Sequence, residues 1–155
     1  MKKGLLFLIC GCIILLFCRC PFSRWGWYCE NNTANDTLGV YLAWGFYSAY
    51  PDTVLPSTAP SPLWVLFPGE KTLVYISSGG YEEIIKDLPK DTLSVFFFNE
   101  DTLKAYNWQI IRSDYKILVR YDLSFNDLKI LNWTIPYPPT EAMRNMKMYP
   151  PYGNE

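Results

Sequence analysis

The sequence contains five cysteines and no histidine, which limits the chemistry that it can perform. A Ser-His or Cys-His nucleophile pair needs an imidazole base, so neither can be assembled. Zinc sites would also lack their commonest nitrogen ligand. Cys29 is the one cysteine beyond residue 20, and its neighbours Tyr28 and Glu30 favour the neutral thiol over the reactive thiolate. We therefore expect neither a cysteine nucleophile nor an internal disulfide framework.

Two carboxylate pairs, Glu82-Glu83 and Glu100-Asp101, remain as candidates for acid–base chemistry. Adjacent residues at the start of a helix point in different directions, and carboxylates at that position interact favourably with the helix N-terminus. The sequence therefore predicts structural roles for both pairs and a protein without catalytic residues. If the chain were an enzyme, a two-carboxylate glycosidase would be its most reasonable form.

Three methionines, Met143, Met146 and Met148, form an M-x-x-M-x-M pattern in a segment predicted as helical, residues 141–148. Thioethers at such a spacing can bind copper(I). The alternative is a small apolar stripe that docks on the rest of the protein. We favour the stripe, and so predict no metal and no cofactor.

The N-terminus has the pattern of a secretory signal. Lys2 and Lys3 form a positive start, and residues 4–17 are uncharged and almost wholly apolar, with Arg19 just beyond. As a helix this run would span about 21 Å, which is short of the roughly 30 Å hydrocarbon core of a bilayer. The pattern predicts a signal peptide over residues 1–20 and hence export. The alternative is an uncleaved membrane anchor.

Four cysteines lie within this N-terminal segment: Cys10, Cys12, Cys18 and Cys20. A cysteine at the end of an apolar signal resembles the lipobox of bacterial lipoproteins, where the cysteine is lipidated and becomes the new N-terminus. By position the resemblance assigns lipidation to Cys20, with Cys18 as the second candidate. Phe17 and Arg19 stand where a lipobox has a small residue, which departs from the pattern. The other interpretation is that these thiols serve only as small apolar side chains.

The exported part of the chain is acidic. Without Lys2, Lys3 and Arg19 the 14 basic residues fall to 11, against 15 acidic residues, which leaves a net charge of −4. A nucleic-acid partner would call for a basic face, so we expect none. The expected partners are a membrane, bound through the N-terminal lipid or signal, and a protein or glycan.

Beyond the signal the hydrophobic pattern is mostly that of strands, with short helices in the second half. Strands are predicted at residues 36–44, 63–67, 71–77, 93–98, 116–123 and 132–136, and a turn at residues 30–35. Residues 93–98 are apolar enough for the centre of a sheet. Helices are predicted at residues 81–87, 101–106, 107–113 and 124–131, with Asp101 and Asn107 as N-caps and a capping box from Ser124 to Asp127.

This order of elements predicts a mainly β fold: a two-layer β-sandwich, with an Ig-like arrangement as one form, and short helices in the connections of the second half. The alternative is an α+β sheet with helices on one face. We expect a single β-rich domain over residues 21–136. A C-terminal tail rich in Pro, Met and Tyr, residues 137–155, is expected to pack on that domain.

Three stretches carry a resemblance to a known family: YKILVRYDLSFNDLKILNWTIPYPP (residues 115–139), DTLSVFFFNEDTLKAYNW (residues 91–108) and MKMYPPYG (residues 146–153). They resemble a family of small lipoproteins from gut Bacteroidota for which no reaction or ligand is established. The resemblance covers most of the chain from about residue 25 onward. It implies export, lipidation and a small domain.

The resemblance also bears on a repeated tripeptide, because exported proteins of that phylum carry O-glycans at Asp, then Ser or Thr, then a small aliphatic residue. The threonines that match are Thr53, Thr37, Thr102 and Thr92. Asp-Thr also opens strands and caps helices well, because its short side chains bond to nearby backbone groups. Thr53, in a proline-rich segment, is the strongest of the four candidates for modification, with both alternatives open, and a structural role is favoured for Thr92. Three Asn-x-Thr sequons, at Asn31, Asn35 and Asn132, are interpreted as chance.

Aromatic side chains are abundant, with 6 Trp and 12 Tyr. Exposed rings bind sugars or partner proteins. We expect Trp44, Trp64, Trp108 and Trp133 in the core, and Trp25, Trp27, Tyr149 and Tyr152 over the ends of the sandwich. Together these features predict an exported, lipid-anchored cell-envelope protein that acts as a binding or structural module. The alternative is a small carbohydrate-binding or carbohydrate-active envelope protein.

Overall fold

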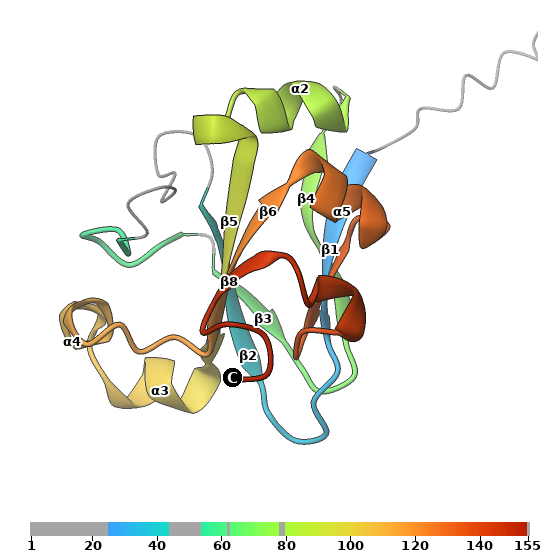
Figure 1. Ribbon diagram of the computed structural model, residues 1–155. Coiled ribbons are helices and arrows are strands. Elements are labelled where there is room, and N and C mark those ends of the chain that lie inside the picture. Colours follow the sequence, from blue (N-terminus) through green and yellow to red (C-terminus); the bar gives the residue numbers. More distant parts are fainter. Residues whose placement is uncertain (1–24, 44–53, 62, 78–79, 155) are drawn as a thin grey trace, which may run out of the picture.

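Strands dominate the part of the chain that the computed structural model describes, which is residues 25–43, 54–61, 63–77 and 80–154. Within these residues eight strands form one sheet of three strands and one of five. Short helices lie at the ends of the sheets and on one face (Figure 1). The prediction of a mainly β, sandwich-like fold is confirmed.

The smaller sheet has the order β4-β1-β7. Its central strand, β1 (Trp25–Asn31), runs antiparallel to β4 (Lys71–Ser77) and parallel to β7 (Thr134–Tyr137). Strand β1 was not predicted from the sequence, whose polar residues from 30 onward indicated a turn. The side chains of β1 alternate between its two faces: Trp27 and Cys29 are fully buried, whereas Tyr28 is exposed.

The larger sheet has the order β3-β2-β5-β6-β8, and all its pairings are antiparallel. Its strands are β3 (Trp64–Leu66), β2 (Leu38–Ala43), β5 (Thr92–Asn99), β6 (Val119–Ser124) and β8 (Lys147–Tyr149). The sequence predicted residues 93–98 as the sheet centre, and this is confirmed because β5 is the middle strand and residues 93–98 are all buried.

The main core lies between the two sheets. Leu93, Val95 and Phe97 of β5 point into it and share one buried cluster with Trp27 and Cys29 of the smaller sheet. The expectation that Trp27 covers an end of the sandwich is therefore wrong. Its place on the inner face of the central strand β1 buries the indole completely, and its ring stacks on Tyr75 at a centroid distance of 4.7 Å.

A second cluster lies on the opposite face of the larger sheet, which is why β5 is apolar on both sides. Phe96 and Phe98 belong to this cluster together with Tyr41 of β2. Leu55 and Ile111 cover them, and helices α3 (Glu100–Ala105) and α4 (Trp108–Ser113) lie along this side of the sheet (Figure 1). The protein thus has a helical layer outside its larger sheet.

Short polar side chains begin these helices. The Asn107 side chain caps α4, as predicted. The predicted cap Asp101 is wrong, because Asn99 caps α3 by accepting the N–H groups of Asp101 and Thr102 at 2.8 and 3.2 Å. Helix α5 (Phe125–Ile130) starts with the predicted capping box between Ser124 and Asp127. Helix α2 (Tyr81–Lys86) carries Ile85 into the main core.

The C-terminal segment differs from its prediction. Residues 141–148 were expected to be helical, but only a short 3-10 turn, η3 (Glu141–Met143), forms before the edge strand β8 pairs with β6. Met143 and Met146 are buried in the main core, and Met148 packs against it. The methionine pattern therefore fills the space beside the sheet, as the stripe interpretation supposed, although it does so without a helix.

Candidate functional site

The outer face of the larger sheet changes from apolar to polar between β5 and β6. Along β6, Val119, Tyr121 and Leu123 enter the main core. Because side chains alternate along a strand, Arg120 and Asp122 point to the other face. Ser94 of β5 lies opposite Asp122 in the strand register and shares that face. Three polar side chains are thus brought together on one surface.

These side chains form a connected network. The Ser94 hydroxyl donates to Asp122 Oδ1 at 2.7 Å, and Arg120 Nε donates to Asp122 Oδ2 at 3.0 Å. Ser94 and Asp122 are only 1% and 5% exposed. A buried carboxylate is costly unless it is paired and hydrogen-bonded, and Asp122 has both an ion pair with Arg120 and a hydrogen bond from Ser94.

The network continues to Tyr115, whose phenol oxygen accepts a hydrogen bond from Arg120 Nη1. Burial raises the pKa of Tyr115 above its ordinary value, although the charge of Arg120 opposes this. The phenol therefore stays protonated at neutral pH. The rings of Tyr115 and of Tyr149 in β8 pack in a T-shaped arrangement at a centroid distance of 5.7 Å, and the Arg120 guanidinium lies 5.8 Å from the centre of the Tyr149 ring.

Side chains of helix α4 hold residues 55–57 in place beside the polar network. Three of its side chains donate to backbone carbonyls of residues 55–57: Arg112 Nε to Leu55 at 2.9 Å, Trp108 Nε1 to Pro56 at 2.8 Å and Gln109 Nε2 to Ser57 at 3.0 Å. These bonds satisfy carbonyls in a segment without regular secondary structure. They hold residues 54–57 against α4, close to the polar network.

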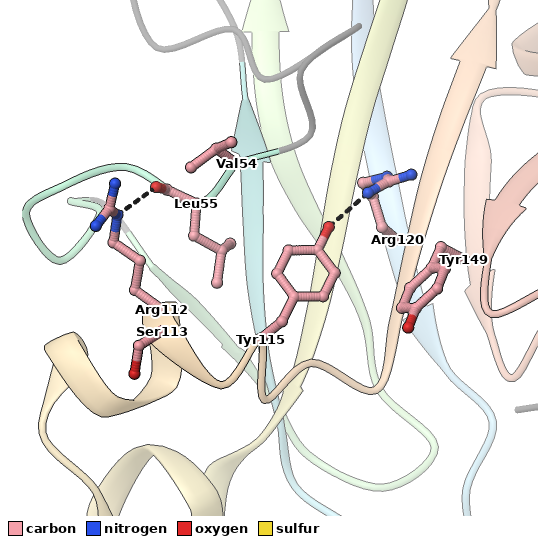
Figure 2. Close-up of a pocket in the computed structure, with 7 residues that line it drawn as sticks. All are labelled: Val54, Leu55, Arg112, Ser113, Tyr115, Arg120 and Tyr149. Carbon is pink, nitrogen blue, oxygen red and sulfur yellow. Dashed lines mark hydrogen bonds between the residues drawn. The ribbon is translucent and has the colours of Figure 1, made fainter.

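A pocket of about 420 Å³ lies between these elements (Figure 2). Its lining comes from three places: residues 54 and 55, the C-terminal end of α4 with the turn that follows, and strands β6 and β8. The lining residues are Val54, Leu55, Arg112, Ser113, Tyr115, Arg120 and Tyr149. Its volume falls in the range of about 300–1,000 Å³ that is usual for small-ligand sites.

The lining residues carry groups that can bind a polar ligand. It contains two guanidinium groups, two phenols and one hydroxyl, and no carboxylate, thiol or amine. Guanidinium groups bind carboxylate or phosphate through paired hydrogen bonds, and phenol rings offer flat contact surfaces. The Ser113 hydroxyl donates to Ile110 O at 3.3 Å and to Asp114 Oδ1 at 3.1 Å. The arrangement can hold an anionic or hydroxyl-bearing ligand.

Of the predicted modification sites, those in the described part of the chain do not line this pocket. Cys18, Cys20 and Thr53 fall outside the described residues. Thr37 and Thr102 are half-buried at the starts of β2 and α3. Thr92 is 8% exposed and its hydroxyl donates to Lys90 O at 2.8 Å. A bulky O-glycan does not fit at such a position in the folded protein, so Thr92 is unsuitable as a glycosylation site.

The Asn31 sequon also has a structural role. Asn31 is fully buried; its amide nitrogen donates to Asp36 O at 2.7 Å and Leu66 O at 3.1 Å, and its oxygen accepts from Thr33. This residue ties the turn after β1 to the β3 edge of the other sheet. Asn35 and Asn132 are exposed.

The Cys29 thiol and the carboxylate pairs take no part in the pocket. Burial raises the pKa of Cys29 far above that of a free thiol, in the direction predicted from the sequence. Glu82 and Glu100 pair with Lys86 and Lys104, each at 2.7 Å, and both carboxylates lie in the first turn of a helix. These carboxylates therefore have the structural roles that their positions indicated.

The expectations for the aromatic residues are met in part. Trp64, Trp108 and Trp133 pack on the two cores but remain partly exposed. Trp44 and the side chain of Trp25 lie outside the described residues. Tyr149 is 50% exposed and Tyr152 is half-buried. Among the described residues, no helix is long and apolar enough to cross a bilayer, and no group of three or more Asp, Glu or Cys could hold a metal ion.

Sequence reasoning missed the pocket residues Arg112, Tyr115 and Arg120. A signal for Arg120 was present, because Arg120 and Asp122 alternate with three apolar residues in the predicted strand. That alternation places two opposite charges on the same strand face. No local pattern connects them with Arg112 or with Val54, which come from distant parts of the chain.

No family model, curated protein or solved structure matches this chain.

Proposed function

We propose that this protein is an exported, lipid-anchored binding module of the cell envelope, without catalytic activity, and that it binds its ligand in the pocket beside Tyr149. Export and anchoring rest on the sequence of the N-terminus, where Lys2 and Lys3 precede an apolar run. The resemblance to small lipoproteins of gut Bacteroidota supports the same location. The lipid would be attached to Cys20 or, as the alternative, to Cys18.

The observation that carries the binding function is the composition of the pocket lining. Two arginines and two tyrosines converge there from α4, the turn after it, β6 and β8, with no acidic side chain among the lining residues. A buried network of Ser94, Asp122 and Arg120 holds one wall in place. Side chains fixed in this way lose little conformational freedom when a ligand binds, which favours affinity.

Anchoring is tested by expression of the full chain in its native host, fractionation of the cells and metabolic labelling with a tagged fatty acid. We expect the label in the membrane fraction, on a chain that begins at the lipidated cysteine. Cys20→Ala and Cys18→Ala are the paired variants, and the label should be lost in only one. Full labelling of both variants would remove the lipidation proposal, and recovery in the cytosol would remove export.

Ligand binding is tested by a glycan array and by affinity capture from native envelopes, each with the wild-type chain and the Tyr149→Ala variant. Tyr149 is half exposed on an edge strand, so its truncation should leave the fold intact. Tyr106→Ala is the matched control, because Tyr106 is also an exposed tyrosine beside a cation but lies outside the pocket. Partners that depend on Tyr149 and not on Tyr106 support the proposal. Partners that bind all three chains equally contradict it.

Thr53, Thr37 and Thr102 remain proposed O-glycosylation sites. Intact-mass measurement of protein from the native host tests them together. A mass equal to the processed polypeptide plus its lipid would contradict the proposal.

A further inference from the structure

We propose that the outer face of the smaller sheet rests on the bilayer to which the chain is anchored, and that Tyr28, Leu73 and Ile76 make the contact. These three side chains are called the apolar sheet face below. The inference rests on the proposed anchoring and adds which surface of the protein meets the lipid. It follows from the exposure of this face, from its place beside the start of β1 and from the charges at its far end.

The side chains of the apolar sheet face are neighbours on strands β1 and β4. Tyr28 pairs with Leu73 in the strand register, and Gly26 pairs with Ile76. A Cβ on Gly26 would collide with Leu73 Cδ1, so the missing side chain lets Leu73 extend over β1 between the two pairs. Tyr28, Leu73 and Ile76 are 37%, 36% and 52% exposed, so the described residues leave this surface open.

An irregularity in the pairing of these strands brings Leu73 and Ile76 to the same face. Where β1 advances by one residue, β4 advances by two, from Tyr75 to Leu73, and the register passes over Val74. Val74 and Tyr75 both pack towards the main core. A bulge of this kind changes the alternation of side chains along a strand. Residues 73 and 76 therefore both point outward, although they are three positions apart.

The apolar sheet face lies beside the N-terminal end of β1, where the proposed anchor joins the domain. Strand β1 starts at Trp25, next to Gly26, and Gly26 pairs with Ile76. With a lipid on Cys20, the five peptide steps to Trp25 span at most about 18 Å. If the apolar run that ends at residue 17 is kept as the anchor instead, the eight steps span at most about 29 Å. Either form of anchoring keeps Ile76 close to the bilayer.

The polarity of this surface rises along the strands, away from the anchor. Ile76 is at the end near the start of β1, whereas Glu30 and Lys71 pair at the opposite end. Tyr28 lies between them, with the Lys71 ammonium 5.0 Å from the centre of its ring. Tyrosine rings favour the headgroup level of a bilayer, and lysine side chains extend their charge to the aqueous side. This order suits contact of Ile76 with the acyl chains and of Lys71 with the headgroups.

Contact through the apolar sheet face directs the candidate pocket away from the bilayer. The pocket is lined by side chains on the outer face of the larger sheet, whereas the apolar sheet face is on the outer face of the smaller one. Both sheets and the main core between them separate the two surfaces (Figure 1). The pocket therefore stays open to a ligand while the chain lies on the membrane.

The experiment uses the full chain, purified from membranes and reconstituted in phosphatidylcholine nanodiscs, with 13C-labelled methyl groups on Ile and Leu. NMR spectra are compared between discs with and without a gadolinium chelate on the lipid headgroups. We expect the chelate to broaden the signals of Leu73 and Ile76 strongly and to leave that of Ile110 sharp. Ile110 is the matched reference, because it is 39% exposed but lies on α4, outside the larger sheet.

A pair of variants tests whether these side chains hold the face on the lipid. The double variant Leu73→Thr, Ile76→Thr keeps residues that favour strands but removes most of the apolar surface. The labelled ring of Tyr28 then reports on docking, with the ring of Tyr106 as its reference, because both are exposed tyrosines beside a lysine. The broadening of Tyr28 should fall to the level of Tyr106 in the double variant and stay unchanged in Ile110→Ala.

The outcomes separate docking from the anchoring on which it rests. If the chain stays in the discs but the chelate broadens Leu73 and Ile76 no more than Ile110, docking is overturned and anchoring stands. If these signals instead shift as the number of copies per disc rises, without broadening by the chelate, the face binds a second copy and docking is overturned as well. If the chain is absent from membranes and does not enter the discs, both proposals fail.

Discussion

Several polar side chains lie almost wholly inside this protein, and each has partners that account for its burial. Asn31 uses both ends of its amide, and Asp122 accepts hydrogen bonds from Ser94 and Arg120. An exception is the indole nitrogen of Trp27, which is buried without a hydrogen-bond partner. A buried polar group destabilises the folded state unless it has hydrogen-bond partners. Groups that have their partners add little net stability, but they fix the positions of the side chains around them. At Asp122 that geometry is the position of Arg120 in the pocket.

Removal of Arg120 should therefore lower the free energy of unfolding. In Arg120→Met, Asp122 would keep a buried charge with one of its two partners missing, and the free energy of unfolding should fall by about 3 kcal/mol or more. Urea unfolding at pH 7 measures this. Arg144→Met is the matched control, because Arg144 pairs with Glu141 on the surface and its loss should change stability far less. Similar losses in both variants would show that Asp122 is not held as a buried charge.

Glu70 should make stability depend on pH. Hydrogen bonds from the Thr72 hydroxyl and the Phe67 N–H lower the pKa of Glu70 in the folded state. A lowered folded-state pKa contributes stability above the unfolded-state value, about 4.3, and this contribution is lost as the pH falls through the folded-state value. Glu70→Gln should therefore be less stable than wild type at pH 7, and the difference should shrink as the pH falls below about 4.

Unfolding by urea at a series of pH values measures the Glu70 effect. Thr72→Val is the companion variant, because it removes the larger cause of the lowered pKa and should flatten the pH dependence while the carboxylate remains. A Glu70→Gln difference that is constant from pH 7 to acid pH would contradict the assignment.

At the scale of elements, the close approach of α3 to the larger sheet depends on Gly39. A Cβ on Gly39 would lie 2.4 Å from Leu103 Cδ1 of α3 and 3.3 Å from Leu63 Cδ2. The missing side chain on β2 thus leaves the space that Leu103 occupies on the outer face of the sheet. Because Leu103 packs on the second cluster, this contact sets the distance between α3 and the larger sheet.

Gly39→Ala should destabilise the protein by about 1–3 kcal/mol, since the added methyl displaces Leu103. The Leu103→Ala background provides the test, because there the methyl has room and the second substitution should cost much less than in wild type. Thermal or urea unfolding of the four chains gives the coupling between the two sites. Additive losses would mean that α3 does not rest on β2 through this contact.

These elements also explain how far the sequence could predict the structure. Strand β5 and the capping box at Ser124 follow local rules and were predicted. Strand β1 was missed because its burial arises from distant partners, β4 and β7, and its aromatic residues do not reveal it locally. Strand β8 was mistaken for helix because M-x-x-M-x-M fits a helical period, while the partner that makes it a strand is β6. The pocket depends on the same long-range contacts, so its residues could not be grouped from the sequence.

For the whole molecule, the segment after residue 137 completes the fold. Strand β8 covers the edge of β6, and Met143 and Met146 fill the main core beside both sheets. Without this segment the β6 edge would expose unpaired backbone groups, and the core would lose two buried side chains. The pocket would also lose Tyr149, one of its lining residues.

Truncation tests this dependence directly. A chain that ends at Thr140 should lose cooperative unfolding or aggregate, because loss of a buried methionine commonly costs about 2–5 kcal/mol and two are removed together with a strand. A chain that ends at Tyr152 keeps β8, both methionines and the contact between Tyr152 and Glu141, and should melt within a few degrees of the full chain. Circular dichroism during heating and resistance to proteolysis distinguish the two. If the Thr140 truncation unfolds cooperatively at an unchanged temperature, the C-terminal segment is an appendage, and the wall that carries Tyr149 is not part of the stable fold.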